Sequence, residues 1–277
     1  MDIRRALSGA LVLLMTVLAC ALPGQPSASP LLPTPDTRLE IMVAETVSAA
    51  LELTRQAVPS ATLSPTSTPE SMIAQVDSSG SALTTGEDGS ALFRDERGKY
   101  QITTPGGWLA VRINQQEFLD AALLPQVAHP AFQRSLDSVQ GQDPNLFRLF
   151  LFDLNEEHID GGFVTNVNFL WNEQEEISLE NETSLMELAD ALPDSLPGSE
   201  VLTVELLPLE NGTKAGIITS RLEAITLDDV AVVLFQKQVL IDLPIGTLSI
   251  TFSTTETWRG VSEPLFDAMI ESFKHVD

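Results

Sequence analysis

Apolar and polar residues alternate through most of the chain after residue 98, with the two-residue period of half-buried strands. The clearest example is the segment 247–254, where Leu248, Ile250 and Phe252 alternate with serine and threonine. The same pattern predicts eight strands, over residues 99–103, 108–113, 146–154, 163–171, 201–207, 215–225, 230–241 and 247–254. Because most of them follow one another through short polar links, we expect a mainly antiparallel sheet.

Turn residues and strand faces add detail to this sheet. Residues 105–107 (Pro-Gly-Gly) and 211–212 (Asn-Gly) are typical of tight turns between strands. In residues 163–171, the aromatic and aliphatic side chains fall on one face and Asn166 and Asn168 on the other. We therefore expect the first face to lie on a core and the asparagine face to contact water.

Helical spacing occurs in four segments of the same region. Two of them cover residues 117–124 and 131–139. Ser184 and Glu187 have the spacing of a capping box and predict a helix that begins there and ends near Pro193. The last helix has an apolar stripe formed by Leu265, Phe266, Met269, Ile270 and Phe273. Helices interspersed with antiparallel strands predict an α+β domain over residues 91–277, with helices covering the sheet.

The N-terminal residues have the pattern of an export signal. Arg4 and Arg5 precede an uncharged, mostly apolar run over 6–19, which is shorter than the roughly 20 residues of a membrane-spanning helix. The run ends in Val-Leu-Ala directly before Cys20, the single cysteine of the chain, and so resembles a bacterial lipobox. That resemblance implies that residues 1–19 are a lipoprotein signal peptide and that the Cys20 thiol carries lipid. A leader cleaved without lipidation, or an uncleaved anchor, is the alternative.

Residues 20–90 are rich in proline, serine and threonine, which is typical of an extended tether. Within this tether, Thr37 and Glu40 have capping-box spacing and predict a helix over 37–57. The helix is either an isolated element of a linker or a stalk that self-associates or docks on a partner. Together with a lipidated cysteine, the tether predicts a domain held at the extracytoplasmic face of the cell membrane.

Two short motifs at the ends of the folded region point to a known family. Residues 100–108 (Tyr-Gln-Ile-Thr-Thr-Pro-Gly-Gly-Trp) resemble the opening of PsbP-like and Mog-like domains, and Ser272-Phe273 is similar to the end of their final helix. The resemblance implies an α/β/α sandwich built on an antiparallel sheet. Members of this family mostly bind or stabilise other proteins, and some lie beside membrane complexes. The helical region over 115–139 is longer than the family pattern, which leaves the topology there open.

The charge of the chain excludes one class of partner. The sequence has 15 Lys and Arg against 39 Asp and Glu, a formal net charge of −24. Such a surface repels phosphate backbones and anionic lipid headgroups, so we expect no nucleic-acid binding and no membrane attachment through a basic patch. The acidity favours solubility, a basic partner or loosely held cations.

The loop over 153–160 is the strongest candidate for a metal site. Its oxygen-bearing side chains alternate in a way that suits Ca²⁺, and the candidate ligands are Asp153, Asn155, Glu157 and Asp160. However, His158 stands where a calcium loop has glycine, and Val164 where it has a bidentate glutamate. A solvated hairpin loop is the alternative interpretation.

Catalytic signatures are missing from the sequence. The chain has three histidines without zinc-site spacing, no G-x-S-x-G motif and no phosphate-binding glycine loop. We therefore expect a lipoprotein that displays a non-enzymatic binding or assembly domain to an envelope protein partner, without a cofactor. The alternatives are a surface hydrolase with dispersed residues around Asp153 and His158, and a component that binds Ca²⁺ or another solute.

Overall fold

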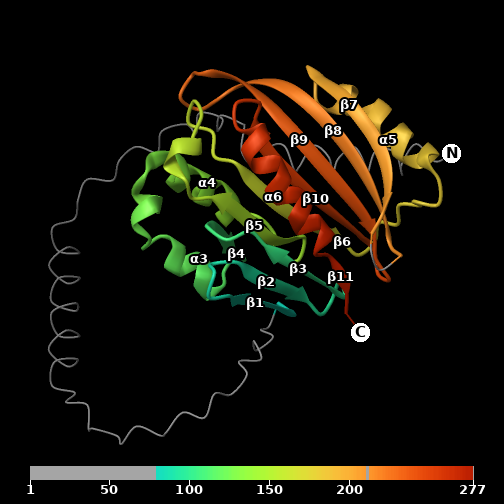
Figure 1. Cartoon of the computed structure of the whole chain (residues 1–277), viewed down its shortest axis with the longest axis horizontal. Helices are drawn as coiled ribbons and strands as arrows, with labels where there is room; N and C mark the ends of the chain where they lie inside the picture. The colour runs from blue at the N-terminus through green and yellow to red at the C-terminus, as the bar shows by residue number, and fades with distance from the viewer. Residues whose placement is uncertain (1–78, 210–211, 277) are drawn as a thin grey trace, which may run out of the picture. The chain divides into compact units, whose positions relative to one another are not determined.

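The computed structural model describes residues 79–209 and 212–276. The expected signal peptide, the lipidation site at Cys20 and the expected helix over 37–57 lie outside the described residues. The described part forms two antiparallel sheets accompanied by four α-helices, which confirms the expected α+β class (Figure 1).

The larger sheet has seven strands in the order β4-β5-β6-β10-β9-β8-β7, and every neighbouring pair is antiparallel. Its strands are β4 Trp108–Val111, β5 Phe147–Asp153, β6 Asn166–Asn172, β7 Ser199–Pro208, β8 Lys214–Ile225, β9 Ala231–Asp242 and β10 Thr247–Thr255. Seven of the eight predicted strands belong to this sheet. The two-residue period identified them because each strand lies flat against at least one apolar layer.

The smaller sheet has the order β1-β2-β3-β11, with strands Ser81–Thr85, Ala91–Asp95, Tyr100–Thr104 and Lys274–His275. Strand β1 pairs with β2 in a segment that the sequence analysis assigned to the tether, so the folded domain already includes residue 81. The composition of this segment was misleading because serine and threonine suit both linkers and strands. A hydrogen bond from Arg112 to the carbonyl of Ser81 (2.8 Å) holds β1 on the domain.

The four helices are α3 Gln116–Ala121, α4 Pro130–Gln140, α5 Glu182–Ser195 and α6 Arg259–Glu271. Two 3₁₀ helices, η1 Pro125–Ala128 and η2 Glu156–His158, lie in the connections. The region over 115–139, whose topology the sequence left open, therefore contains α3, η1 and most of α4, between β4 and β5.

Helix α5 differs from its prediction at both ends. The helix begins at Glu182 rather than at Ser184, because Asn181 is the N-cap and its side chain accepts a hydrogen bond from the backbone of Thr183 (2.9 Å). It also continues past Pro193 to Ser195. A backbone hydrogen bond from Leu196 to Leu192 (2.8 Å) closes the last turn in spite of the proline.

The helices lie on both faces of the seven-stranded sheet, as the family resemblance implied. On one face, α6 and the smaller sheet share an apolar core with Ile250 and Phe252 of β10. On the opposite face, α4 packs on Phe150 and Phe152 of β5, and α5 packs on Ile218 of β8. Figure 1 shows α4 and α5 toward opposite ends of the sheet, with α6 (red) between them on the viewer's side.

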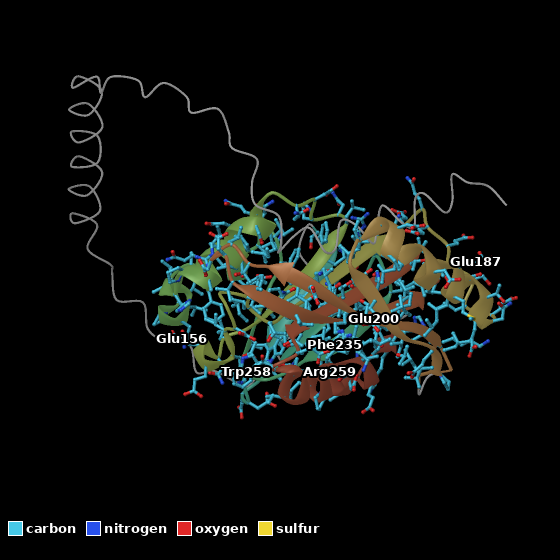
Figure 2. All side chains as sticks on the ribbon, turned by 90° about the horizontal axis from the view of Figure 1, so that it is seen from above. Glu156, Glu187, Glu200, Phe235, Trp258 and Arg259 are labelled. Atoms are coloured by element: carbon cyan, nitrogen blue, oxygen red, sulfur yellow. The ribbon has the colours of Figure 1, made fainter. Side chains whose placement is uncertain are left out.

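Charged side chains fix α6 on strand β9. The ammonium group of Lys237 donates to Asp267 (2.6 Å) and Glu263 (3.1 Å) of the helix. Burial opposes the charge of Lys237, but these hydrogen bonds outweigh it and raise the pKa of the ammonium group. Nε of Arg259 donates to Glu263 (2.9 Å). The guanidinium of Arg259 also lies 3.9 Å from the ring centre of Phe235, and Figure 2 labels both residues.

The prediction of a water-facing asparagine row on β6 is wrong. Asn166 and Asn168 are only 4% and 2% exposed. The two-residue period assigned them correctly to the face opposite Phe169, but that second face is also enclosed. The sequence of β6 alone could not show this, because burial of the second face depends on residues outside the strand.

Candidate functional site

A cleft of about 740 Å³ opens at one end of the domain, where four separate segments converge. It is lined by residues 176–180, 212–214, 242–244, Gly246 and His275. These residues come from the β6–α5 connection, the β7–β8 connection with the first residue of β8, the end of β9 with the β9–β10 turn, and the C-terminal strand β11. The volume lies in the range of small-ligand pockets in proteins.

The β9–β10 turn and the β6–α5 connection are held together by close backbone contact. Gly246 has a φ of +73°, and a Cβ at this position would overlap the carbonyl oxygen of Asn172, so the turn requires glycine. The hydroxyl of Thr247 donates to the carbonyl of Glu175 (2.8 Å) and accepts from the backbone N–H of Ile177 (3.2 Å). The acidic connection is therefore fixed along one wall of the cleft.

Carboxylates dominate the electrostatics of the cleft. Glu176, Glu180 and Asp242 line it. Burial, together with the negative charge of Glu176, raises the pKa of the Asp242 carboxyl. Burial also raises the pKa of the adjacent Glu175, against the effect of a hydrogen bond from Asn172 (3.0 Å). Because Asp242 is exposed to solvent at the end of β9, its negative charge is only modestly less favourable in the cleft than in water.

The two basic side chains of the cleft already have hydrogen-bond partners. Lys214 donates from its ammonium group to the carbonyl oxygen of Glu180 (3.0 Å). His275 approaches Thr213, with Nε2 and the hydroxyl oxygen 2.7 Å apart, and its ring packs edge-on against Phe273. The ammonium group of Lys214 keeps its positive charge, but the carboxylates of Glu176, Glu180 and Asp242 outnumber it, so the cleft favours a further cationic group.

Replacing Asp242 should reveal the unfavourable charge of the cleft. Because the folded protein binds a proton at Asp242 more tightly than the unfolded chain does, ionisation of this carboxyl destabilises the fold as the pH rises. We expect Asp242→Asn to raise the melting temperature at pH 7 by roughly 1–2 °C, the size of a surface effect. The gain should vanish near pH 3, below the ordinary aspartate pKa of about 3.9. Asp190→Asn on the exposed side of α5 is the control, and an equal gain there would contradict this explanation.

The loop over 153–160 forms a hydrogen-bonded cluster of its own. Oδ2 of Asp153 lies 2.6 Å from Nδ1 of His158, and Oδ1 accepts from the backbone of Asn155 (3.0 Å). The side-chain oxygen of Asn155 accepts from the backbone of Glu157 (3.0 Å) and caps η2. The structure therefore brings Asp153 and Asn155 together around His158, but it uses their oxygens for local turns.

The other two candidate ligands lie apart from that cluster. The side chain of Glu157 is exposed, and Asp160 forms an isolated backbone bridge with Phe163. Within residues 79–209 and 212–276, no group of three or more His, Cys, Asp or Glu side chains is placed to hold a metal ion. The His158 ring lies against Trp258, with ring centres 4.5 Å apart, and Figure 2 shows Trp258 and Glu156 at the same end of the domain.

Comparisons with known proteins give only distant similarity. No family model matches the chain, and no curated protein sequence matches it. A putative regulator of unknown function from Pseudomonas aeruginosa is 15% identical over 40% of this chain and 72% of that protein, with a TM-score of 0.31. The Ran-binding protein Mog1p of Saccharomyces cerevisiae is 13% identical over 65% of this chain and 92% of its own, with a TM-score of 0.37.

A third solved structure is LpqN, a protein involved in cell envelope biogenesis of Mycobacterium tuberculosis. It is 10% identical over 71% of this chain and 91% of its own, with a TM-score of 0.38. Similarity at this level does not place the chain in the family of any of these proteins.

Proposed function

We propose that this chain is a lipid-anchored protein of the cell envelope that displays a binding domain, and that its cleft receives a basic side chain of a partner protein. The anchoring part of the proposal is supported by the lipobox-like sequence that ends at Cys20. Among the described residues, no helix is both long and apolar enough to cross a membrane.

The single observation that carries the binding role is the raised pKa of Asp242 in a cleft that it shares with Glu176. Two exposed carboxylates that repel each other gain from a positive charge placed beside them, because the cation relieves their repulsion. A lysine or arginine side chain supplies this charge together with a hydrocarbon stem, which suits the aliphatic wall formed by Ile177, Leu179 and Leu243.

A side chain from a protein fits the cleft better than a bare ion does. The cavity of about 740 Å³ exceeds the space that a single cation and its ligands occupy. The formal net charge of −24 also steers a basic protein toward this surface from a distance.

A charge-matched binding experiment tests the proposal. The probe is an N-acetylated, C-amidated tetralysine peptide, titrated into the purified protein by isothermal calorimetry at low salt. We expect Asp242→Asn to weaken binding about fivefold, the effect of losing one partly exposed ion pair. Asp190→Asn on α5 changes the net charge by the same amount and should leave the affinity unchanged. An equal loss in both variants would mean that the peptide responds to net charge and not to the cleft.

A further inference from the structure

Strand β7 forms a free edge at one end of the seven-stranded sheet. It is ten residues long and has β8 as its only described neighbour, so one of its two sides has no described strand beside it (Figure 1). None of its residues is buried, and Leu202 and Leu207 are 38% and 41% exposed. Strand β4, at the opposite edge, has four residues, two of which are buried. Among the described strands, β7 is therefore the longest one at the edge of a sheet.

The β7–β8 turn fixes the direction in which the backbone groups of β7 point. Beside the turn, the N–H of Leu209 donates to the carbonyl of Thr213 (2.7 Å), so Leu209 faces β8. Successive residues of an antiparallel strand alternate between facing the neighbouring strand and facing away from it. Because the register against β8 is unbroken over residues 203–208, Glu205 and Leu207 also face β8.

The residues between them point their backbone groups away from the sheet. Val204 and Leu206 therefore present their N–H and C=O groups at the free edge, where the described part of the chain places no strand. Pro208 occupies the next position of the same kind, which agrees with this direction, because a proline in a sheet is tolerated where its nitrogen faces solvent. A row of outward backbone groups is a template for a further strand.

The side chains of β7 differ between the two faces of the strand. Val204 packs against the apolar cluster under α5, which includes Leu185 and Ile218. Glu205 and Leu207 lie on the other face and are exposed. A strand added at this edge would place alternate side chains beside the apolar layer under α5 and beside an exposed carboxylate.

The charge around the edge determines which strand fits. Residues 180–205, which include α5 and most of β7, contain seven carboxylates and no lysine or arginine. Glu200 pairs with Arg221 (2.5 Å), but Glu205 has no ion-pair partner within the part of the chain that the structure describes. A second copy of β7 would bring the same glutamates beside one another, and like charges across a strand pair are destabilising. These charges favour a basic strand and disfavour a second copy of the chain.

We propose that β7 accepts an extended segment of a partner protein as an eighth strand, in which lysine or arginine alternates with apolar residues. Backbone hydrogen bonds to Val204 and Leu206 supply the affinity, the basic side chains pair with Glu205, and the apolar side chains lie along the layer under α5. No residue of β7 lines the acidic cleft, and occupation of the edge does not depend on the proposed role of that cleft.

Amide hydrogen exchange, measured by NMR, tests the proposal residue by residue. The probe is the N-acetylated, C-amidated heptapeptide Lys-Val-Lys-Val-Lys-Val-Lys, added to purified Cys20→Ser protein, which cannot carry lipid at that position. A saturating concentration should slow the exchange of the Val204 and Leu206 N–H groups about tenfold, because they gain hydrogen bonds. The Glu205 and Leu207 N–H groups already face β8 and should change little. Absence of binding, or binding without this alternating protection, would overturn the proposal.

Two modified peptides separate strand pairing from charge. Methylation of every backbone nitrogen of the probe keeps its positive charges and removes its backbone donors, so it should weaken binding about tenfold. Replacement of every lysine by glutamate keeps the backbone and reverses the charges, and it should abolish binding. If the methylated peptide binds as tightly as the probe, charge alone accounts for the binding and the strand assignment is wrong.

Variants of β7 make the same comparison from the side of the protein. Leu206→Pro removes an outward N–H and should weaken binding about tenfold, whereas Leu206→Ala keeps this N–H and should leave the affinity within about twofold. An equal loss in both variants would contradict the role of the backbone, and the methylated peptide supplies this comparison if Leu206→Pro fails to fold. Glu205→Gln should weaken binding about threefold, and Asp137→Asn on the exposed side of α4 is the charge-matched control that should have no effect.

Sedimentation analysis of the Cys20→Ser protein without peptide distinguishes a partner strand from a second copy of the chain. We expect a monomer, because the glutamates of β7 oppose pairing of the strand with itself. A dimer that Leu206→Pro dissociates would show that a second copy occupies the edge, and it would overturn the assignment to a basic partner.

Discussion

Replacing Arg148 with methionine should lower the free energy of unfolding by about 3–5 kcal/mol, the cost of leaving one member of a buried ion pair without its partner. The Arg148 and Asp95 side chains are 1% and 0% exposed, and Nε of the arginine lies 2.6 Å from Oδ2 of the aspartate. Strand β2 carries Asp95 and β5 carries Arg148, so the ion pair connects the two sheets.

The remaining polar atoms of Asp95 and Arg148 form hydrogen bonds with other parts of the fold. The second oxygen of Asp95 accepts from the backbone of Arg97 and of Gly98 (both 3.0 Å) and closes the β2–β3 turn. Arg148 also donates to the carbonyls of Pro144 (2.9 Å) and Ser79 (2.8 Å). A methionine fills the space but satisfies none of these acceptors, so the loss should exceed that of a simple packing change.

Urea unfolding of three variants separates the ion pair from its surroundings. Arg221→Met, which breaks an exposed pair with Glu200, is the control and should cost no more than about 1 kcal/mol. The double variant Asp95→Asn with Arg148→Met should recover part of the loss, because it removes the unpaired buried charge. If Arg148→Met costs no more than Arg221→Met, the two sheets do not depend on this contact.

Replacing Cys20 with serine should move the protein from the membrane fraction to the soluble fraction. Each buried CH₂ of an acyl chain contributes about 0.8 kcal/mol, so two or three chains give durable attachment and their loss abolishes it. The acidic chain, with its formal net charge of −24, has no electrostatic attraction to anionic lipids that could replace them.

The test is cell fractionation followed by a high-salt wash. The natural chain should stay with the membranes through the wash, and Cys20→Ser should be released with an unchanged melting profile of the folded domain. If Cys20→Ser stays in the washed membranes, the attachment does not depend on the cysteine.

Local sequence patterns were sufficient for most of the larger sheet. Strand β10 shows why: Leu248, Ile250 and Phe252 all enter one core, so the period of the pattern equals the period of the pleat. Strand β1 was missed because its serine and threonine residues resemble a linker, although it pairs with β2, the next strand along the chain.

The functional regions depend on contacts that no single segment contains. The β6–α5 connection, which includes Glu176, has the acidic sequence of a solvated loop. The cleft forms only because the fold brings Asp242 and His275 beside this connection. The polar face of β10 was visible as alternating Ser and Thr residues, but the sequence of the strand could not show that this face is buried. In the loop over 153–160, the hydrogen bonds within the turn were decisive, and spacing alone could not distinguish them from ligand positions.

The proposed role at the envelope depends most directly on the chemical state of the mature N-terminus, which intact-protein mass spectrometry of the membrane-extracted protein measures. We expect a chain that begins at Cys20 and carries the added mass of two or three acyl chains. An unmodified Cys20 thiol, or a chain that retains residues 1–19, would contradict the account.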